Sequence, residues 1–174
     1  MALREILKEP NDVLRQKSLP VEIVDEKIRE LIDDMLETMY AAPGIGLAAI
    51  QVGVPKRVIV MDTSKKEGEK LPMHFVNPEI ISKSNSNSIY EEGCLSLPGQ
   101  FAEIERPAKC KIKFLDYNGN PQEIEAEGML ATCIQHEIDH LEGILFIDYL
   151  SKLKKIMIVK KLSKQKKEIE RIIV

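Results

Sequence analysis

The segment from Met129 to Leu141 constrains the fold more than any other, because it combines helical periodicity with two histidines spaced four residues apart. In a helix, His136 and His140 lie on one face, about 40° apart around the axis. The opposite sector carries only apolar side chains, from Leu130, Ile134, Ile138 and Leu141. We therefore expect a helix whose apolar back is buried in a core and whose front is available for chemistry.

The front of this helix has the pattern His-Glu-x-x-His, from His136 to His140. Two imidazoles at this spacing can bind one metal ion, and the glutamate beside them, Glu137, can act as a general base. A five-residue pattern can arise by chance, but two of the three histidines in the chain fall into this one. We interpret it as half of a metal site.

A hydrolytic metal site needs a third protein ligand and one open position. No histidine follows His140, Glu142 is too near in sequence to fold back, and Glu168 and Glu170 lie in a basic tail. Cys94 is the better candidate, because the glycines and proline of EEGCLSLPG permit an irregular strand and a thiolate binds zinc or ferrous iron strongly.

The remaining pattern predicts an α+β fold, with antiparallel or mixed sheets packed around the 129–141 helix. Residues 25–40 form an amphipathic helix with Asp25 as its N-cap, and Ser151 begins a last helix toward Ile173. Between them we expect strands at 57–62, 74–77, 79–83 and 89–97, and a hairpin of 110–114 with 122–127. Residues 1–150 should form a single catalytic domain, with 151–174 a basic C-terminal helix of the same domain.

Charge and composition indicate where the protein works. The N-terminus has no apolar signal segment, no apolar run approaches the length of a membrane span, and three scattered cysteines favour a reducing compartment. We expect a cytoplasmic protein without a membrane or DNA partner. The formal charge of −3 conceals nine Lys or Arg against two Glu in residues 151–174, so a polyanion would meet this tail.

Three short segments resemble the signature motifs of the peptide deformylases, in the same order: GIGLAAIQ at 44–51, EGCLS at 92–96 and QHEIDHLEG at 135–143. The similarity extends from the opening ILKEPNDVLR to DYLSKLK near residue 154. Three independent matches in order are far more specific than one. The resemblance implies a metal-dependent hydrolase that removes the formyl group from the N-terminal formyl-methionine of new proteins and releases formate.

The resemblance also implies a role for each matching residue. Cys94, His136 and His140 would bind one divalent metal ion, ferrous iron in the cell, with zinc, nickel or cobalt possible in purified protein. Water bound to this ion would attack the formyl carbon, with Glu137 as general base and then acid. The side-chain amide of Gln51 and the backbone N–H of Leu95 would stabilise the negative charge on the formyl oxygen.

The substrate should bind as an added strand and be selected through its first side chain. The resemblance implies backbone pairing with Ile45, Gly46 and Gly93. Apolar groups near the metal face, Met129, Cys133 and Ile45, could hold the methionine thioether. The tail resembles a ribosome-binding helix of some bacterial deformylases, so a ribosome contact is a further expectation.

Three other interpretations fit parts of the pattern. Cys133 could join Cys94 and both histidines in a closed structural zinc site, although Glu137 would then be an uncompensated carboxylate. The basic tail could belong to a ribosome-associated module without activity, against which Glu137 and Gln51 both argue. A generic metalloprotease would need a ligand that this sequence does not supply.

Overall fold

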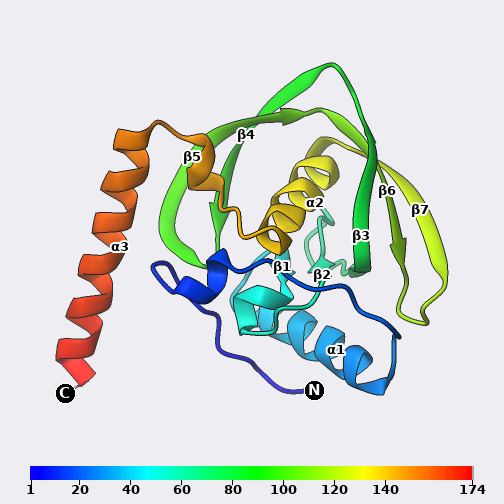
Figure 1. Ribbon diagram of the computed structural model, residues 1–174, viewed down its shortest axis with the longest axis horizontal. Coiled ribbons are helices and arrows are strands. Elements are labelled where there is room, and N and C mark those ends of the chain that lie inside the picture. Colours follow the sequence, from blue (N-terminus) through cyan, green and yellow to red (C-terminus); the bar gives the residue numbers. More distant parts are fainter. Residues whose placement is uncertain (174) are drawn as a thin grey trace.

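Figure 1 shows the computed structural model, which describes residues 1–173. Val174, the last residue of the predicted basic segment, lies outside the described residues. The elements in chain order are η1 (Asp12–Arg15), α1 (Glu26–Ala41), β1 (Gly46–Ala48), η2 (Ala49–Val52), β2 (Val58–Met61), β3 (Met73–Lys83), β4 (Asn87–Cys94), β5 (Leu97–Pro107), β6 (Lys109–Leu115), β7 (Pro121–Glu127), α2 (Gly128–Leu141), η3 (Phe146–Tyr149) and α3 (Lys152–Ile173).

The strands of residues 1–173 form two antiparallel sheets. The larger has five strands in the order β1-β2-β3-β6-β7, and the smaller pairs β4 with β5. Helix α2 lies between these sheets (Figure 1). The predicted α+β class, with antiparallel sheets around the histidine-bearing helix, is confirmed.

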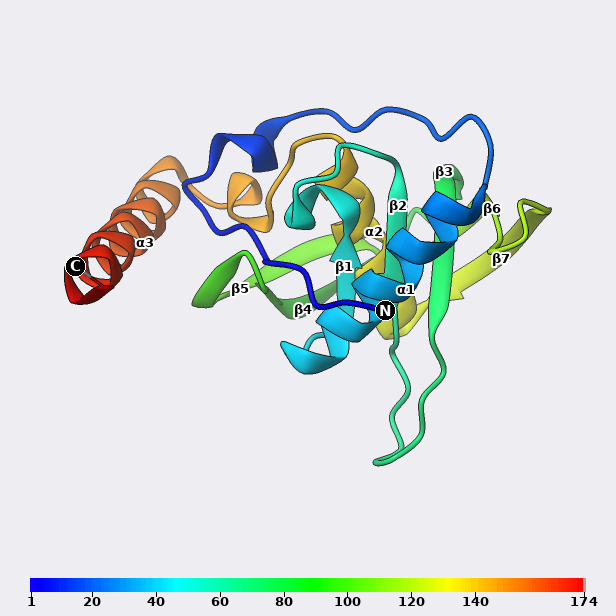
Figure 2. The ribbon, with the colours of Figure 1, turned by 90° about the horizontal axis from the view of Figure 1, so that it is seen from below.

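Strand β2 is buried on both faces, and its side chains alternate between two hydrophobic clusters. Val58 and Val60 pack toward α1, whereas Ile59 and Met61 pack toward α2. Figure 2 shows α1 and α2 on opposite sides of β1 and β2. Because successive strand residues point to opposite faces, one short strand of β-branched and long apolar residues supports both helices.

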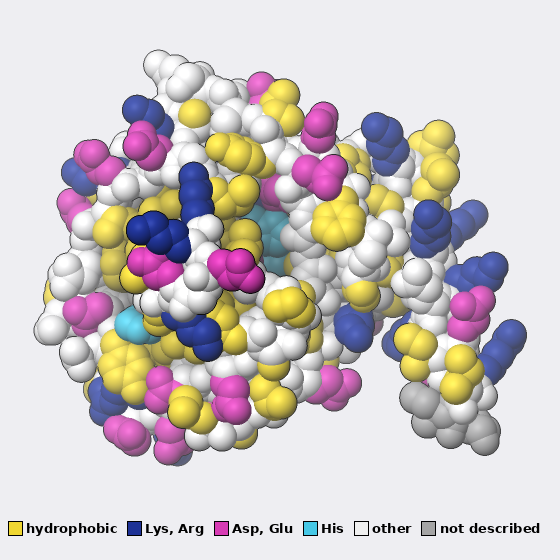
Figure 3. All heavy atoms as spheres, turned by 180° about the vertical axis from the view of Figure 1, so that it is seen from behind, with side chains coloured by type: hydrophobic (Ala, Val, Ile, Leu, Met, Phe, Trp, Pro, Cys, Tyr) yellow, Lys and Arg dark blue, Asp and Glu magenta, His cyan; other side chains and the backbone are white. Residues whose placement is uncertain are grey.

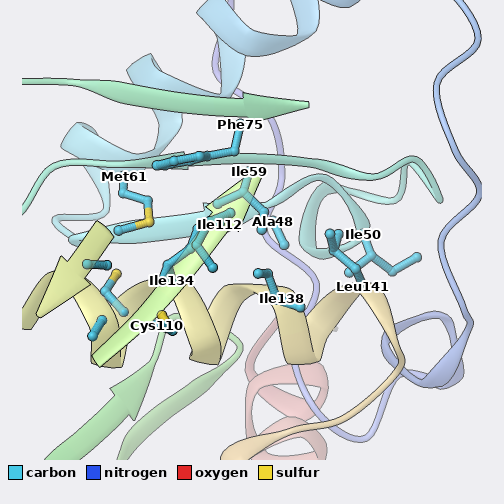
Figure 4. Packing of buried hydrophobic residues seen from close by; sticks show 13 residues of the cluster. Ala48, Ile50, Ile59, Met61, Phe75, Cys110, Ile112, Ile134, Ile138 and Leu141 are labelled. Atoms are coloured by element: carbon cyan, nitrogen blue, oxygen red, sulfur yellow. The ribbon is translucent and has the colours of Figure 1, made fainter. Parts of the chain in front are cut away.

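The apolar back of α2 lies where the sequence predicts. Ile134, Ile138 and Leu141 face strand residues such as Ile59 and Ile112 across the main core (Figure 4). Ile134 and Leu141 have no exposed surface, and burying a side chain of this size stabilises the fold by about 1.5–3 kcal/mol. This packing fixes the rotation of α2 and so turns its two histidines toward β4 of the smaller sheet.

Two predicted strand boundaries are wrong. Pro78 was expected to separate two strands, but β3 runs through it, because a register irregularity between Val76 and Glu79 accommodates the missing N–H and Asn77 takes a positive φ of 51°. The strand predicted over 89–97 ends at Cys94, and a turn leads into β5 at Leu97. The N-cap at Asp25 is confirmed by a 3.0 Å hydrogen bond from the Ile28 N–H to its side chain.

Helix α3 begins after Ser151, as predicted, and its Lys154 N–H lies 3.3 Å from the Ser151 hydroxyl oxygen. Leu162 is buried in a cluster with Leu97 and Phe146, which attaches α3 to the smaller sheet and η3. The end of α3 points away from the body of the molecule (Figures 1 and 2). In residues 1–173, no helix combines the length and the apolar character needed to cross a membrane.

Candidate active site

The front of α2 meets the end of β4, and this meeting brings Cys94, His136 and His140 together. Their ligand atoms all lie within 4.8 Å of one another, and Cys94 Sγ is 3.3 Å from His140 Nε2. Cys94 reaches this place because the β4–β5 register shifts at Gly93 and Cys94, so the strand leaves its regular ladder at the cysteine. A thiolate and two imidazoles suit zinc, ferrous iron and similar divalent ions.

Burial gives His140 the form that binds metal. This residue is 1% exposed, and burial lowers its pKa, with the neighbouring His136 and Arg106 charges acting in the same direction. A lower pKa favours the neutral imidazole, which has the free lone pair that a metal requires.

A chain of ionic hydrogen bonds supports His136 from behind. Its Nδ1 donates to Glu92 Oε1 at 2.8 Å, which leaves Nε2 as the free ligand atom. Arg106 donates to both oxygens of Glu92, at 2.7 and 2.9 Å, and to Asp139 Oδ2 at 2.9 Å. The Tyr149 hydroxyl also donates to Asp139 Oδ2, at 2.7 Å.

This network holds Glu92 ionised inside the protein. Burial acts to raise the pKa of the Glu92 carboxyl, but the hydrogen bonds from His136 and Arg106 outweigh it and keep the pKa below its usual range. Sequence reasoning gave Glu92 no role. Its place two residues before Cys94, on the same side of an alternating strand, was the available signal.

Glu137 lies beside the ligands and is almost fully buried. Burial is the main cause that raises the pKa of its carboxyl, to about 7. Its Oε2 atom has no hydrogen-bond partner in residues 1–173. A Cβ at Gly46 would lie 2.5 Å from Glu137 Oε1, so only glycine lets β1 pass this close to the carboxylate.

Gln51, the last residue of the GIGLAAIQ segment, is brought to the same place by η2. It is 1% exposed, and its Nε2 donates to Ser96 Oγ at 3.0 Å and lies 3.5 Å from Cys94 Sγ. Leu95 lies beside it in the turn between β4 and β5. Sequence reasoning gave Ser96 no role, although it belongs to the EGCLS segment.

The N-terminal segment forms backbone hydrogen bonds with both the GIGLAAIQ segment and the EGCLS segment. The Leu7 N–H donates to the Gln51 carbonyl at 2.7 Å, and the Glu9 N–H donates to the Ser96 carbonyl at 2.8 Å. We call residues 3–9 the N-terminal strap. It ties η2 to the turn between β4 and β5.

A cavity of about 1170 Å³ opens over these residues. Figure 3 shows this hollow, with histidine at its floor and hydrophobic side chains around it. The five residues predicted to bind substrate all line it: Ile45, Gly46, Gly93, Met129 and Cys133. Ile45 is half exposed at the rim, whereas Cys133 is buried near the floor.

The edges of two strands border this cavity. Strand β1 is the edge of the larger sheet, and β4 is paired to β5 on one side. Residues 45–46 and 91–95, which lie in or directly next to these strands, all line the cavity. An extended peptide placed between them would find backbone groups on both sides.

Cys133 is not part of the metal-ligand cluster. Within residues 1–173, the group of potential ligands that come together contains Cys94, His136 and His140 alone. The Cys133 thiol instead points to the Ile45 carbonyl, 3.8 Å away, and burial raises its pKa well above the usual value. A closed site with two cysteines therefore has no support from the geometry.

The comparisons with known proteins agree on one family. Residues 3–156 match the family model described as polypeptide deformylase. The chain is 67% identical to a peptide deformylase of Pelagibacter ubique, covering 95% of this chain and 96% of that protein, and 60% identical to that of Phenylobacterium zucineum, covering 96% and 99%. The crystal structure of a peptide deformylase from Ehrlichia chaffeensis in complex with actinonin superposes with a TM-score of 0.91 at 46% identity, covering 95% of this chain and 98% of that one.

Proposed function

Because the chain belongs to the polypeptide deformylase family, and is thus a metal-dependent hydrolase that removes the N-formyl group from nascent peptides, we propose a role for each residue of the candidate site. The observation that carries the proposal is the convergence of three segments far apart in sequence, which bring Cys94, His136, His140, Glu137 and Gln51 together. Cys94, His136 and Glu137 of this group line the cavity.

Cys94, His136 and His140 hold one divalent metal ion in this proposal. The donor set fits, since three ligand atoms within 4.8 Å of one another match the spacing around a tetrahedral ion and leave its fourth position open. Bound there, the ion acidifies water and polarises a carbonyl group. We propose ferrous iron in the cell, with zinc, nickel or cobalt able to occupy the same ligands in purified protein.

Glu137 is the proposed general base and acid. It would accept a proton from the attacking water and pass it to the departing amine nitrogen. The buried carboxylate with an unpartnered Oε2 supports this role, as does a pKa of about 7, close to the optimum for proton transfer at neutral pH. Its closeness to Gly46, in the edge strand β1, also supports this role.

Gln51 and Leu95 are the proposed donors to the formyl oxygen. As the formyl carbon becomes tetrahedral, negative charge gathers on this oxygen, and the Gln51 amide and the Leu95 N–H stabilise it. In other enzymes one such donor contributes about 3–4 kcal/mol to the transition state. The burial of Gln51 supports the proposal, because a fixed donor in a dry site needs little reorganisation during the reaction.

The substrate backbone would lie between the edges of β1 and β4, paired with Ile45, Gly46 and Gly93. Main-chain pairing ignores side chains and so admits many sequences after the first residue. Met129 and Cys133, at the cavity wall, would contact the methionine side chain.

Release of formate from a formyl-methionyl peptide tests the proposed function directly. The metal-loaded protein should release formate at a rate proportional to enzyme, and an acetylated peptide of the same sequence is the matched control. Cleavage of internal peptide bonds with no formate release would instead identify a general protease.

We further propose that the protein is cytoplasmic and that α3 contacts the ribosome. Residues 151–174 carry the excess of positive charge, and Figure 3 shows Lys and Arg along the described part of α3. Leu162 packs on the smaller sheet, which supports counting this segment as part of the same domain as 1–150. The exposed apolar residues of α3, including Leu153 and Met157, would lie against the partner.

The ribosome contact is tested by charge removal, because deleting α3 would also remove buried Leu162. Replacing exposed Lys160, Lys164 and Lys167 by Gln should weaken co-sedimentation with ribosomes, and the binding of unchanged protein should fall steeply with salt. The control replaces Lys65 and Lys66 in the exposed loop after β2. Equal sedimentation of both variants would contradict the proposal.

A further inference from the structure

We propose that Ser96 is a positioning residue that holds the Gln51 amide in the orientation needed to donate to the formyl oxygen. The inference deepens the proposed function and rests on the role given there to Gln51. It concerns the hydroxyl group of Ser96, which lies in the turn after Cys94, between β4 and β5.

Both side chains are shielded from water. Ser96 is 0% exposed and Gln51 is 1% exposed, and the hydrogen bond from Gln51 Nε2 to Ser96 Oγ measures 3.0 Å. Because both side chains are buried, water cannot replace the Gln51 amide or the Ser96 hydroxyl as a hydrogen-bond partner. The orientation of the amide therefore depends on the protein groups around it.

The backbone N–H of Ala48, the last residue of β1, fixes which end of the amide faces Ser96. The Ala48 N–H, 2.9 Å from Gln51 Oε1, can only donate, so the atom that faces it must be the amide oxygen. The amide nitrogen must then face Ser96 and Cys94. The assignment of oxygen and nitrogen thus follows from the donors and acceptors present.

The two hydrogens of the amide nitrogen have different partners. One is donated to Ser96 Oγ, and the other points toward Cys94 Sγ across 3.5 Å, a long and weak contact. The second hydrogen is therefore the one that a developing oxyanion beside Cys94 can accept. Ser96 binds the first hydrogen and so aims the second into the site.

Removal of the Ser96 hydroxyl would leave a buried N–H without an acceptor. The terminal torsion of glutamine is soft, so the amide would turn to recover a hydrogen bond. That rotation moves the second hydrogen away from the formyl oxygen. The loss should appear in the chemical step, because the donor contributes more as charge develops than in the bound substrate.

The strap holds the two residues in register. The Leu7 N–H fixes the Gln51 carbonyl and the Glu9 N–H fixes the Ser96 carbonyl, at 2.7 and 2.8 Å. Both main chains are thus restrained independently of the side-chain bond. A change at the Ser96 hydroxyl can alter the amide without displacing the backbone.

The test compares Ser96→Ala with Ser18→Ala, a matched control with a buried hydroxyl that has no hydrogen-bond partner in residues 1–173. Ser96→Ala should lower kcat about tenfold with KM within about twofold, a smaller effect than loss of a whole oxyanion donor. Ser96→Cys is nearly isosteric with serine but has a weaker acceptor, so its kcat should lie between that of Ser96→Ala and that of the control. Metal content and thermal midpoint are measured for every variant, and Ser96→Cys carries the comparison if Ser96→Ala does not fold.

A double-mutant cycle with Gln51→Ala distinguishes the positioning role of Ser96 from the oxyanion-stabilising role of Gln51. Once Gln51 is alanine, Ser96→Ala should lower kcat no further, because its effect passes through the amide. An undiminished additional loss in that background, or full kcat in Ser96→Ala alone, overturns the role of Ser96. Full kcat in Gln51→Ala overturns the role of Gln51 itself.

Discussion

Glu92 and His136 share a 2.8 Å hydrogen bond that joins the smaller sheet to the histidine-bearing helix. The bond fixes which nitrogen of His136 faces Cys94, although Glu92 itself is not among the ligands. Orientation of a ligand by a buried carboxylate raises its basicity and reduces the entropy lost on metal binding.

Glu92→Gln should therefore weaken metal binding by about 10- to 100-fold, because the amide cannot retain the charge that pairs with His136 and Arg106. Competition with a chelator, followed by elemental analysis, measures the affinity. The control is Glu91→Gln, which changes the exposed neighbour. Equal retention of metal by both variants would remove Glu92 from the support of the site.

Glu137→Gln should keep the metal but lose about 10²- to 10⁴-fold in kcat, because the amide preserves the shape of the side chain and cannot accept a proton. Formate release and metal content are measured on the same preparation. Turnover at the rate of the unchanged protein would assign proton transfer to another group.

If the native metal is ferrous iron, the iron and nickel forms of the protein should differ in how long they stay active in air. Protein purified without oxygen should contain iron and lose activity aerobically, since oxygen attacks both ferrous iron and the Cys94 thiolate. Nickel-substituted protein should remain active for longer under the same conditions. Equal lifetimes for the two forms would argue against iron as the native metal.

The lowered pKa of Asp62 predicts that the folded protein loses stability in acid, independently of catalysis. Burial alone would raise its pKa, but hydrogen bonds from the Tyr40 hydroxyl and from the Ser64 and Leu71 backbones lower it to about 2. A folded pKa below the unfolded value stabilises the protein above about pH 4, and this stabilisation disappears as the pH falls toward 2. The contribution is at most about 2.5 kcal/mol.

Asp62→Asn should accordingly be less stable at neutral pH and should lose less of its remaining stability between pH 4 and pH 2. Urea unfolding at a series of pH values measures both effects. Glu67→Gln, in the exposed loop after β2, is the control. Parallel pH curves for Asp62→Asn and the unchanged protein would contradict the prediction.

The sequence predicted those parts of the molecule that depend on local periodicity. The two faces of α2 follow from its helical spacing, and α1 and α3 follow from their periodicity and caps. The path of β3 through Pro78 could not be predicted this way, because a bulge depends on pairing with β6, which local sequence does not encode.

In the candidate site, too, local spacing predicts some residues and long-range contacts determine the others. His136 and His140 are identified by spacing within one helix, whereas Glu92 and Ser96 acquire their contacts only when the smaller sheet meets α2 and η2. Alternation along β4 says which residues share a face but not which distant side chain each one meets. The contacts of Glu92 and Ser96 can therefore be identified only from the folded structure.

The N-terminal strap has a consequence for the order in which the protein becomes active during its own synthesis. Leu7 and Glu9 are among the first residues made, yet they bind the carbonyls of Gln51 and Ser96, and both His136 and His140 are made later still. Contacts between residues so far apart in sequence form slowly and lower the folding rate. A growing chain that stops before α2 contains Gln51 and Cys94 but lacks His136, Glu137 and His140. The complete candidate site can therefore form only after most of the chain has been made.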